Sequence, residues 1–501
     1  MQHPRSKRPR IVSSSTDVAS SSDSSFDASS TSRRQTSHRS AMLRSRAAMA
    51  AADSVGFPAP ALQSPDYIDM GLCTGVCEYC GALFWFQERL TSFPISVRPR
   101  YNRCCRGGRI KLQYPSEPPD LLKSLFSDTQ FMLNIRAYNA MFCMTSFGAV
   151  VDDATNQGGG PYVFKVAGQV SHWLGSLCPS SGDGPRFLQM YVYDSEHEIA
   201  NRLRFFPTIG SDHTAAKTVA ALAQMLDHVN PYVRLFRSAR ELCSQADIPD
   251  FEIRLHNRVR DNRYSTPASH TLGAIVCDNS QLSADFDVVI KSKDNTPHRV
   301  SKLHSAYMPL QYPLLFPRAE QGWSPDLKLT GTEPTTADEE VPDDPNLTPI
   351  MFYGYQMHDR ENVYTHILRA SKLLQQYLVD AYICVEHCRL DYYRANQDEF
   401  RCEFFQGVQD AVSRGDTDAS TIGKRVILPS SFTGGPRYMY KHYQDALAKC
   451  RVHGNPQYFI TFTCNVRWPE ITREISRVGA ANAQDRPDII ARVFQTKVLK
   501  L

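Results

Sequence analysis

Two pairs of closely spaced cysteines near the front of the chain constrain its folding most, because both pairs can reach one metal ion. "CEYC" places Cys77 and Cys80 in a knuckle whose spacing lets two thiolates contact one tetrahedral ion. Twenty-three residues then separate Cys80 from the adjacent Cys104 and Cys105. Four thiolates in this arrangement suit a structural zinc ion, with Cys73 as an alternative fourth ligand. A set of buried thiols without a metal is the competing interpretation.

The cysteine content also indicates the compartment. Fourteen cysteines occur in 501 residues, and the N-terminus has no apolar core of a secretory signal. A reducing environment, with thiols or metal sites rather than disulfides, is therefore expected. The apolar runs fall short of the ~18 residues that a membrane-spanning helix needs, so we expect no membrane partner.

The first 66 residues differ in composition from the rest. Residues 1–66 are serine-rich and of low complexity, which predicts a disordered tail. Arg5, Lys7, Arg8 and Arg10 form a basic cluster of the nuclear-import or nucleic-acid type, so we expect a nuclear location. A solvated charged tail without that role is the alternative.

Behind a cysteine segment at 70–115, residues 116–323 alternate strand-like and helix-like stretches, which predicts a mixed α+β domain. Helices are expected after Asp194 and at 213–229, and a glycine-rich hairpin loop at 158–160. Residues 307–317 are interpreted as connecting chain. An acidic linker at 324–349 marks the domain boundary. Strands are predicted at 140–151, 161–174, 186–194, 251–258, 270–278 and 286–293.

The last segment, 350–501, is predicted to be rich in helices. Residues 360–397 form a long amphipathic pattern and residues 437–452 a second helix. In "YFITFTCNVRWPEI", residues 458–464 predict one buried β-strand and the following residues a helix start. The chain as a whole is therefore expected to be α+β.

Known catalytic patterns are missing from the sequence. Gly423-Lys424 is followed by Arg425 where a Walker A loop needs Ser or Thr, so no nucleotide site is expected. The fifteen histidines never stand one residue apart, and neither HExxH nor GxSxG occurs. These residues alone predict no catalytic centre, and the chain by itself is not expected to be an enzyme.

A binding surface is the remaining candidate. "RVILPSSFTGGPRYMY" combines the hydroxyls of three side chains with cationic and aromatic groups, a mixture that suits phosphates and stacked bases. The alternative is an ordinary loop ahead of a packed helix. The candidate nucleic-acid-binding residues are Arg425, Ser430, Ser431, Thr433, Arg437 and Tyr438.

Several long stretches of the chain, over residues 70–501, resemble Helitron transposon proteins. "RVILPSSFTGGPRYMYKHYQDALAKCRVHGNPQYFITFTCNVRWPEI" is similar to their helicase-like N-terminal region, as are "YMPLQYPLLFP", "CEYCGALFWFQERL" and "CCRGGRIKL". The resemblance implies a zinc-finger-like element at the front cysteines. It also implies the first motif of a Rep nuclease, at Thr461, Thr463, Asn465 and Pro469, as the leading strand of an incomplete Rep-type sheet.

The family's activity is rolling-circle transposition by a nuclease and a DNA helicase. The paired histidines, the nucleophilic tyrosine and the helicase motifs of that family do not occur here. We therefore expect a truncated, transposon-derived protein that binds single- or double-stranded DNA. Two alternatives stay open: one piece of a complete nuclease–helicase, or a relic without function.

Overall fold

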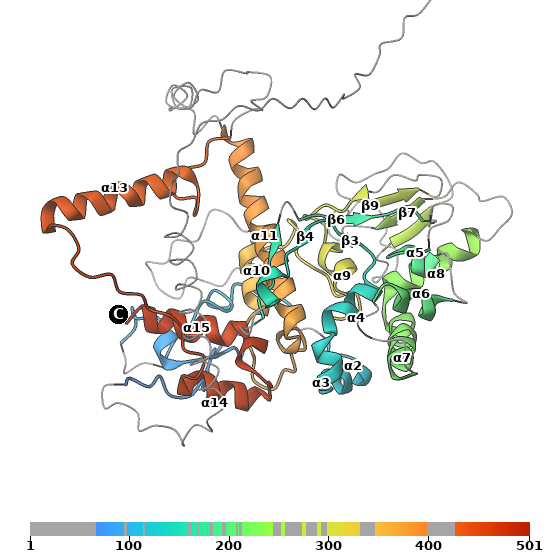
Figure 1. Ribbon diagram of the computed structural model, residues 1–501, viewed down its shortest axis with the longest axis horizontal. Helices are drawn as coiled ribbons and strands as arrows, with labels where there is room; N and C mark the ends of the chain where they lie inside the picture. The colour runs from blue at the N-terminus through green and yellow to red at the C-terminus, as the bar shows by residue number, and fades with distance from the viewer. Residues whose placement is uncertain are drawn as a thin grey trace, which may run out of the picture. The chain divides into compact units, whose positions relative to one another are not determined.

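The computed structural model describes residues 67–500 with gaps. The longer gaps are 244–251, 256–272, 277–287, 292–297, 331–345 and 398–425, and shorter ones lie at 95–97, at 114–115 and between 158 and 212. The chain divides into two units, Met1–Ile68 and Asp69–Leu501. The predicted disordered tail and the basic cluster therefore lie outside the described residues. The second unit is α+β, as predicted: mostly helical, with small sheets (Figure 1).

Within the described ranges, the strands form four small antiparallel sheets. The front cysteine segment contributes β1 (Gly75–Val76) and β2 (Leu83–Phe84), followed by the 3-10 turn η1 (Phe86–Glu88). The other sheets have the orders β10-β6-β3, β4-β5 and β8-β7-β9. Their strands are β3 (Ser146–Phe147), β4 (Val150–Val151), β5 (Val166–Ala167), β6 (His172–Leu174), β7 (Glu252–Leu255), β8 (Gly273–Val276), β9 (Val288–Lys291) and β10 (His298–Arg299).

Helices precede, separate and follow these sheets. Among the described residues they are α2 (Asp120–Leu125), α3 (Thr129–Leu133), α4 (Ile135–Phe142), η2 (Ala154–Gln157), α5 (Gln189–Val192), α6 (Glu198–Arg204), α7 (His213–Val229), α8 (Pro231–Cys243), α9 (Tyr307–Gln311), α10 (Pro349–Gln356), η4 (Ile367–Arg369), α11 (Lys372–Ala395), α13 (Pro436–His453), α14 (Pro469–Val478), η6 (Ala483–Asp485) and α15 (Pro487–Val498).

The predicted end of the helix at 213–229 is confirmed, and the side chain of Asn230 explains it. Helix α7 ends at Val229, where Asn230 interrupts the helical pattern. The Asn230 side chain then accepts hydrogen bonds from the backbone N–H groups of Tyr232 and Val233, at 3.0 and 3.2 Å. This is an N-cap, and Pro231 fits the first position of α8 because that position needs no N–H donor.

Two strand predictions in the middle domain are wrong in part. Residues 189–192 are the helix α5, and residues 140–142 finish α4 before β3 begins. Tyr191 shows why: its hydroxyl donates to the carbonyl of Phe142 at 2.6 Å, and its ring lies against Arg202. Tertiary packing of this kind overrides the strand preference of a short apolar run. The antiparallel pairing of β4 with β5 on either side of the predicted loop is confirmed, although the loop's glycines at 158–160 lie outside the described residues. The strands predicted at 251–258, 270–278 and 286–293 are confirmed as β7, β8 and β9, which form one sheet.

The predicted buried strand at 458–464 is also wrong. These residues belong to no sheet of the described chain; residues 458–463 are exposed, and Cys464 is half-buried against the smaller of two hydrophobic cores. The exposed fractions of Tyr458, Phe459 and Ile460 are 83%, 95% and 87%. An isolated strand has no ladder of hydrogen bonds, so its apolar pattern alone does not bury it. The helix start that was predicted after it is confirmed as α14.

Two hydrophobic cores hold the unit together. The larger combines side chains from the cysteine segment, from the middle region and from α10 and α11. The prediction of residues 307–317 as connecting chain is wrong in part, because all of them are buried, most belong to this core and the first five form α9. The smaller core joins Trp85 to Ile471 and Ile475 of α14 and to Ile489 and Val493 of α15. Lys328 and Asn346, at the two described ends of the predicted acidic linker, form an isolated antiparallel β-bridge. The predicted domain boundaries stay predictions.

A buried polar network links the middle region to α11. Asp380 of α11 is fully buried, and its carboxylate contacts His172 of β6 at 2.7 Å. The hydroxyl of Tyr312 donates to the same oxygen at 2.9 Å, and the imidazole of His172 stacks on Tyr307. Because buried polar groups must be paired, this network fixes the register of α11 against the sheet.

Candidate metal centre and nucleic-acid interface

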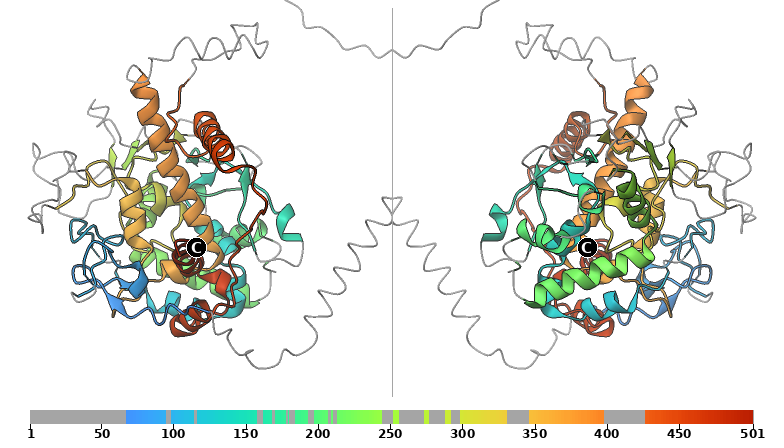
Figure 2. Two further views of the ribbon diagram at one scale, coloured as in Figure 1. Left: turned by 90° about the vertical axis from the view of Figure 1, so that its left-hand side faces the viewer. Right: turned by 90° about the vertical axis from the view of Figure 1, so that its right-hand side faces the viewer.

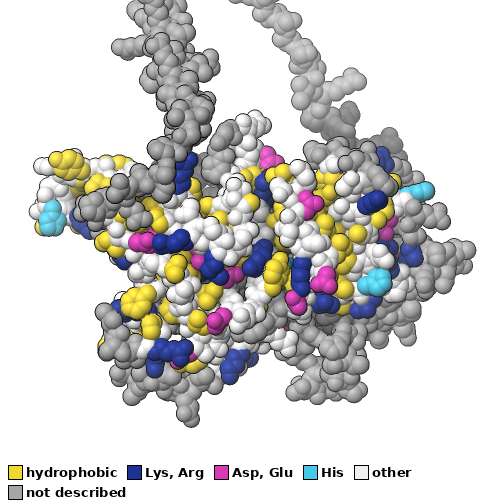
Figure 3. Space-filling model, turned by 90° about the horizontal axis from the view of Figure 1, so that it is seen from below, with side chains coloured by type: hydrophobic (Ala, Val, Ile, Leu, Met, Phe, Trp, Pro, Cys, Tyr) yellow, Lys and Arg dark blue, Asp and Glu magenta, His cyan; other side chains and the backbone are white. Residues whose placement is uncertain are grey.

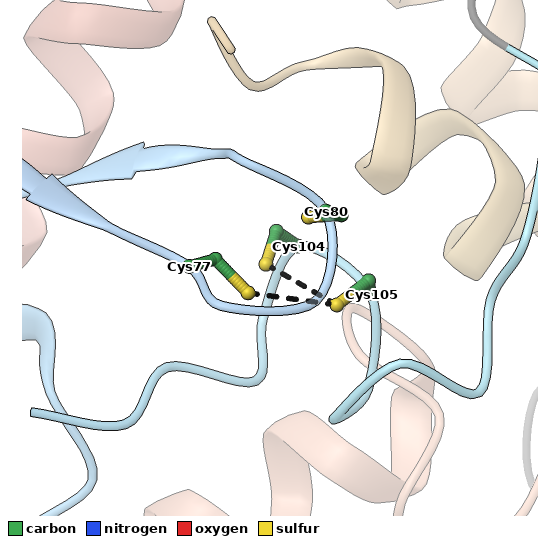
Figure 4. A group of neighbouring side chains, drawn as sticks. All are labelled: Cys77, Cys80, Cys104 and Cys105. Carbon is green, nitrogen blue, oxygen red and sulfur yellow. Dashed lines mark hydrogen bonds between the residues drawn. The ribbon is translucent and has the colours of Figure 1, made fainter. Parts of the chain in front are cut away.

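A tight hairpin positions the first cysteine pair. The backbone N–H of Cys77 donates to Ala82 and that of Gly81 donates to Cys77, both at 2.9 Å. Gly81 has a φ of +67°, which a residue with a side chain rarely adopts. This turn brings the side chains of Cys77 and Cys80 to the same side of the hairpin (Figure 4).

A second loop, which contains Gly108, positions the other cysteine pair, Cys104 and Cys105. The backbone N–H of Gly108 donates to the sulfur of Cys105 at 3.3 Å, a bond that favours a thiolate there. Gly108 also has a φ of +87°, and a Cβ at this position would lie 2.7 Å from the ring of Tyr79. Glycine is therefore required where this loop crosses the first one.

The four sulfurs converge (Figure 4). They lie within 4.8 Å of one another, and Cys105 is 3.7 Å from both Cys77 and Cys104. A tetrahedron with Zn–S bonds of about 2.3 Å has edges of about 3.8 Å, so these sulfurs can hold a metal ion such as zinc with little movement. The adjacency of Cys104 and Cys105 does not prevent both from facing the centre.

Electrostatics favours a cation at this centre. All four cysteines are at most 5% exposed. Hydrogen bonds from Cys104 and Cys105 lower the pKa of Cys77, whereas hydrogen bonds among the thiols and burial raise the pKa of Cys104. Thiols this close cannot all ionise by themselves, because each thiolate opposes the next. A divalent cation offsets the repulsion among the thiolates and binds them.

Cys73, the alternative fourth ligand, lies elsewhere. It is buried in the smaller core beside Trp85, outside the four-cysteine cluster. Burial raises the pKa of the Cys73 thiol to about 12, so it stays protonated at neutral pH.

The cysteine element is bonded to the chain around residue 360. The backbone N–H of Leu83 donates to Asp359 at 2.8 Å, and that of Glu361 donates to Gly81 at 3.0 Å. The Tyr101 hydroxyl lies 3.0 Å from Nε2 of His358. The two cysteine loops are thus part of the same folded unit as the chain around residue 360.

Residues in and just before the cysteine segment also form ion pairs and a hydrogen bond with α14 and α15. Arg492 of α15 pairs with Glu88 at 2.7 Å and donates to the carbonyl of Leu83 at 2.9 Å. Arg473 of α14 pairs with Asp69 at 2.8 Å. In both views of Figure 2 and in Figure 1, the two helices lie beside the blue cysteine segment. These partners stand about four hundred residues apart in sequence, so no local pattern could have predicted them.

The residues predicted to bind nucleic acid differ in location and exposure. Arg425 lies outside the described residues. Ser430, Ser431 and Thr433 are exposed in the loop before α13. Arg437 and Tyr438 lie half-buried in the first turn of α13, which begins at Pro436. The structure thus places five of the six on one continuous segment, and their role in binding stays a prediction.

Helix α13 itself has no buried residue, although it is 18 residues long. It stands apart from the other labelled helices in Figure 1. Met439, Tyr440 and Tyr443 are 60%, 63% and 58% exposed. Within the described part of the chain α13 therefore buries none of its side chains, while both interpretations of this segment, a binding surface and an ordinary loop ahead of a packed helix, stay predictions.

The four residues of the resembled Rep motif lead into α14. Thr461 and Thr463 are exposed on the segment between α13 and α14. The Asn465 side chain accepts the backbone N–H of Arg467 at 2.9 Å, which turns the chain toward the helix. Pro469 occupies the first position of α14.

Comparison with known protein families agrees with the sequence resemblance. A family model described as the Helitron helicase-like domain at the N-terminus matches residues 352–501, which is 150 of the 501 residues. This confirms the resemblance over α10 to α15. No curated protein matches the chain. Within the part of the chain that the structure describes, we find no helix with the length and apolarity to cross a bilayer.

Proposed function

We propose that this chain, whose residues 352–501 form a Helitron helicase-like N-terminal domain, binds single-stranded DNA through α13 and its flanking segments. The observation that carries the proposal is that none of the 18 residues of α13 is buried. A long helix gains most of its stability by burying an apolar face, so a helix with none buried keeps that face available to a partner.

The charge on α13 fits an anionic partner. The helix carries Arg437, Lys441, Lys449 and Arg451 against the single acid Asp445, a net charge of +3. Elsewhere the signs are mixed: on the face shown in Figure 3, Lys and Arg side chains are interspersed with Asp and Glu. A local excess of cations attracts phosphates through counterion release, and the binding it produces weakens steeply with salt.

The aromatic side chains fit single-stranded bases. Tyr440 and Tyr443 are exposed on α13, and Tyr458 and Phe459 continue the exposed aromatic surface on the segment that follows. Stacking of a base on such a ring contributes roughly 1–3 kcal/mol and requires unpaired bases. The aromatic groups therefore support a single strand over a duplex.

The proposed cofactor is one zinc ion at Cys77, Cys80, Cys104 and Cys105. Four thiolates close the coordination sphere, as in structural sites, and leave no position for water or substrate. Its role is then to hold the two cysteine loops in the shape that contacts α14 and α15.

A nuclear location remains our proposal for a protein that binds DNA, and imaging of a fluorescent fusion with Arg8 and Arg10 changed to Ala tests it.

The test is a titration of a labelled oligonucleotide at several salt concentrations. Changing Tyr440 and Tyr443 to Ala should weaken binding about 30-fold or more, because two stacked bases are lost. Tyr382 on α11 is 60% exposed and carries no flanking cluster of cations, so Tyr382→Ala is the matched control. If the double variant binds as tightly as the control, or if affinity does not depend on salt, the proposal is wrong.

A further inference from the structure

Residues 98–111, which carry the second cysteine pair, are rich in cations and contain no acid, so their formal charge is +6. We call this segment the basic loop. The preceding residues 73–97 do not offset it, because they hold two acids and one arginine, and one of the acids, Glu88, is already paired with Arg492. The six cations of the basic loop are Arg98, Arg100, Arg103, Arg106, Arg109 and Lys111.

The cations of the basic loop face outward. Buried residues such as Tyr101, Cys104 and Ile110 alternate with them along the chain and hold the inner side of the loop in the larger core. Two of the cations are half-buried, and the other four are exposed. The exposed ones are Arg98, Arg103, Arg106 and Lys111.

The positive charge of the basic loop is not neutralised within the described chain. None of its six cations forms an ion pair with a described carboxylate. The arginines of the C-terminal region differ, since Arg473, Arg486 and Arg492 each pair with a carboxylate. Arg100 lies instead over the ring of Phe93, 4.6 Å from its centroid. Neighbouring cations repel one another, so the loop suits a polyanion that supplies the missing negative charge.

Hydrogen bonds fix the backbone of the basic loop. The carbonyl of Arg100 accepts the N–H of Leu90 at 2.8 Å. The carbonyl of Arg109 accepts both the N–H and the hydroxyl of Thr330, at 2.8 and 3.1 Å. Between these points the adjacent cysteine pair directs its sulfurs into the four-cysteine cluster (Figure 4). A loop that is already ordered loses little conformational entropy when it binds a partner.

The basic loop has no exposed aromatic ring. Its one aromatic residue, Tyr101, is 4% exposed and stacks on Phe84. The loop therefore differs from α13, whose exposed tyrosines can stack on unpaired bases. Guanidinium groups bind phosphates through paired hydrogen bonds, and the phosphates of a duplex can be reached without unpairing its bases. A zinc ion with four thiolates has a formal charge of about −2, which is buried and smaller than the +6 of the loop.

We infer that the basic loop binds the phosphate backbone of a nucleic-acid duplex, as a second surface on a segment separate from α13. Each cation that meets a phosphate releases a counterion, so the affinity should fall steeply with salt. Phosphates are the same in every sequence, so the loop should not discriminate between base sequences. The duplex is either DNA or RNA, whose phosphates present the same chemistry to the loop. The inference does not rest on the proposed role of α13.

Fluorescence anisotropy with a labelled blunt duplex, titrated at several salt concentrations, tests the inference. The full chain carries Tyr440→Ala and Tyr443→Ala, so that the proposed single-strand surface does not stack on frayed ends. Changing Arg98, Arg103 and Arg106 to Gln should weaken binding about 100-fold at about 0.1 M salt and reduce the slope of log K against log salt by about 3. The matched control removes the same charge from three exposed cations outside the loop and should leave the slope unchanged. These are Lys217, Arg234 and Lys500.

A second variant guards against damage to the fold. Arg103 and Arg106 flank the cysteine pair, so the melting temperature of the triple variant is measured as well. If it melts early, Arg98→Gln with Lys111→Gln, at the two ends of the loop, replaces it and should reduce the slope by about 2. Titrations with duplex DNA and duplex RNA of one sequence assign the source to the duplex that binds more tightly, and equal affinity assigns the loop to both.

Three results would overturn the inference. The first is that no duplex binds, and the second is that the loop variants and the control lose affinity and slope equally. The third is that polyglutamate displaces the labelled duplex as well as an unlabelled duplex of equal charge does, because an acidic protein would then fit the loop equally well. None of these results depends on whether α13 binds a single strand.

Discussion

Replacing Trp85 by Ala should release α14 and α15 while the rest of the unit stays folded. Trp85 is 1% exposed and belongs to the smaller core, whereas its neighbour Phe84 belongs to the larger one. Successive side chains of extended backbone point to opposite sides, so strand β2 and the extended Trp85 that follows it contribute to both cores. The smaller core has only seven buried side chains, so loss of its largest member leaves little to hold the helices.

The expected magnitude follows from the size of the side chain. Truncating a buried tryptophan costs about 3–5 kcal/mol. The guanidinium of Arg492 lies 4.9 Å from the Trp85 ring centroid, and loss of that contact adds about 1 kcal/mol. At about 1.4 kcal/mol per factor of ten, a loss near 4 kcal/mol should speed amide exchange in α14 and α15 about 1000-fold.

Hydrogen exchange followed by mass spectrometry on peptides from 471–493 measures this effect. Trp323→Ala is the matched control, because Trp323 lies in the larger core and its indole donates to Leu347. That variant should weaken the whole unit without singling out the C-terminal helices. The reasoning is refuted if Trp85→Ala leaves protection in α14 and α15 unchanged, or if α11 loses protection to the same extent.

Two further predictions concern buried polar groups. Asp380→Ala should lower the free energy of unfolding by about 3–5 kcal/mol in a denaturant titration, because His172 and Tyr312 lose a buried partner; a cost below 1 kcal/mol would contradict the network. Burial lowers the pKa of His366 from 6.5 to about 4, and its Nε2 lies 2.7 Å from the carbonyl of Leu315. The unfolded chain therefore binds this proton more readily, so stability should fall by about 3 kcal/mol between pH 6.5 and pH 4. In His366→Gln that part of the pH dependence should disappear, and an unchanged slope would exclude His366 as its source.

The sequence predicted those features whose causes are local. The period of apolar residues predicted α7, and the turn chemistry of Asn230-Pro231 predicted its end. The spacing of Cys77 and Cys80 predicted half of the four-cysteine cluster, and the adjacent pair Cys104 and Cys105 predicted the other half. These signals act within a few residues, so they are visible in one sequence.

Features that depend on distant partners were missed or misjudged. Residues 458–464 have a strand-like pattern, but burial would require a neighbouring strand that the pattern cannot supply. The ion pair between Glu88 and Arg492 joins residues 404 positions apart, so no short sequence pattern indicates it.

The metal content of the purified chain tests the central claim, a structural zinc at the four-cysteine cluster, most directly. Elemental analysis should give one zinc ion per chain. Cys104→Ser should lose it, whereas Cys73→Ser should keep it, because Cys73 lies in the smaller core. Absence of zinc from a folded parent chain, or loss of zinc in Cys73→Ser with retention in Cys104→Ser, would contradict the account.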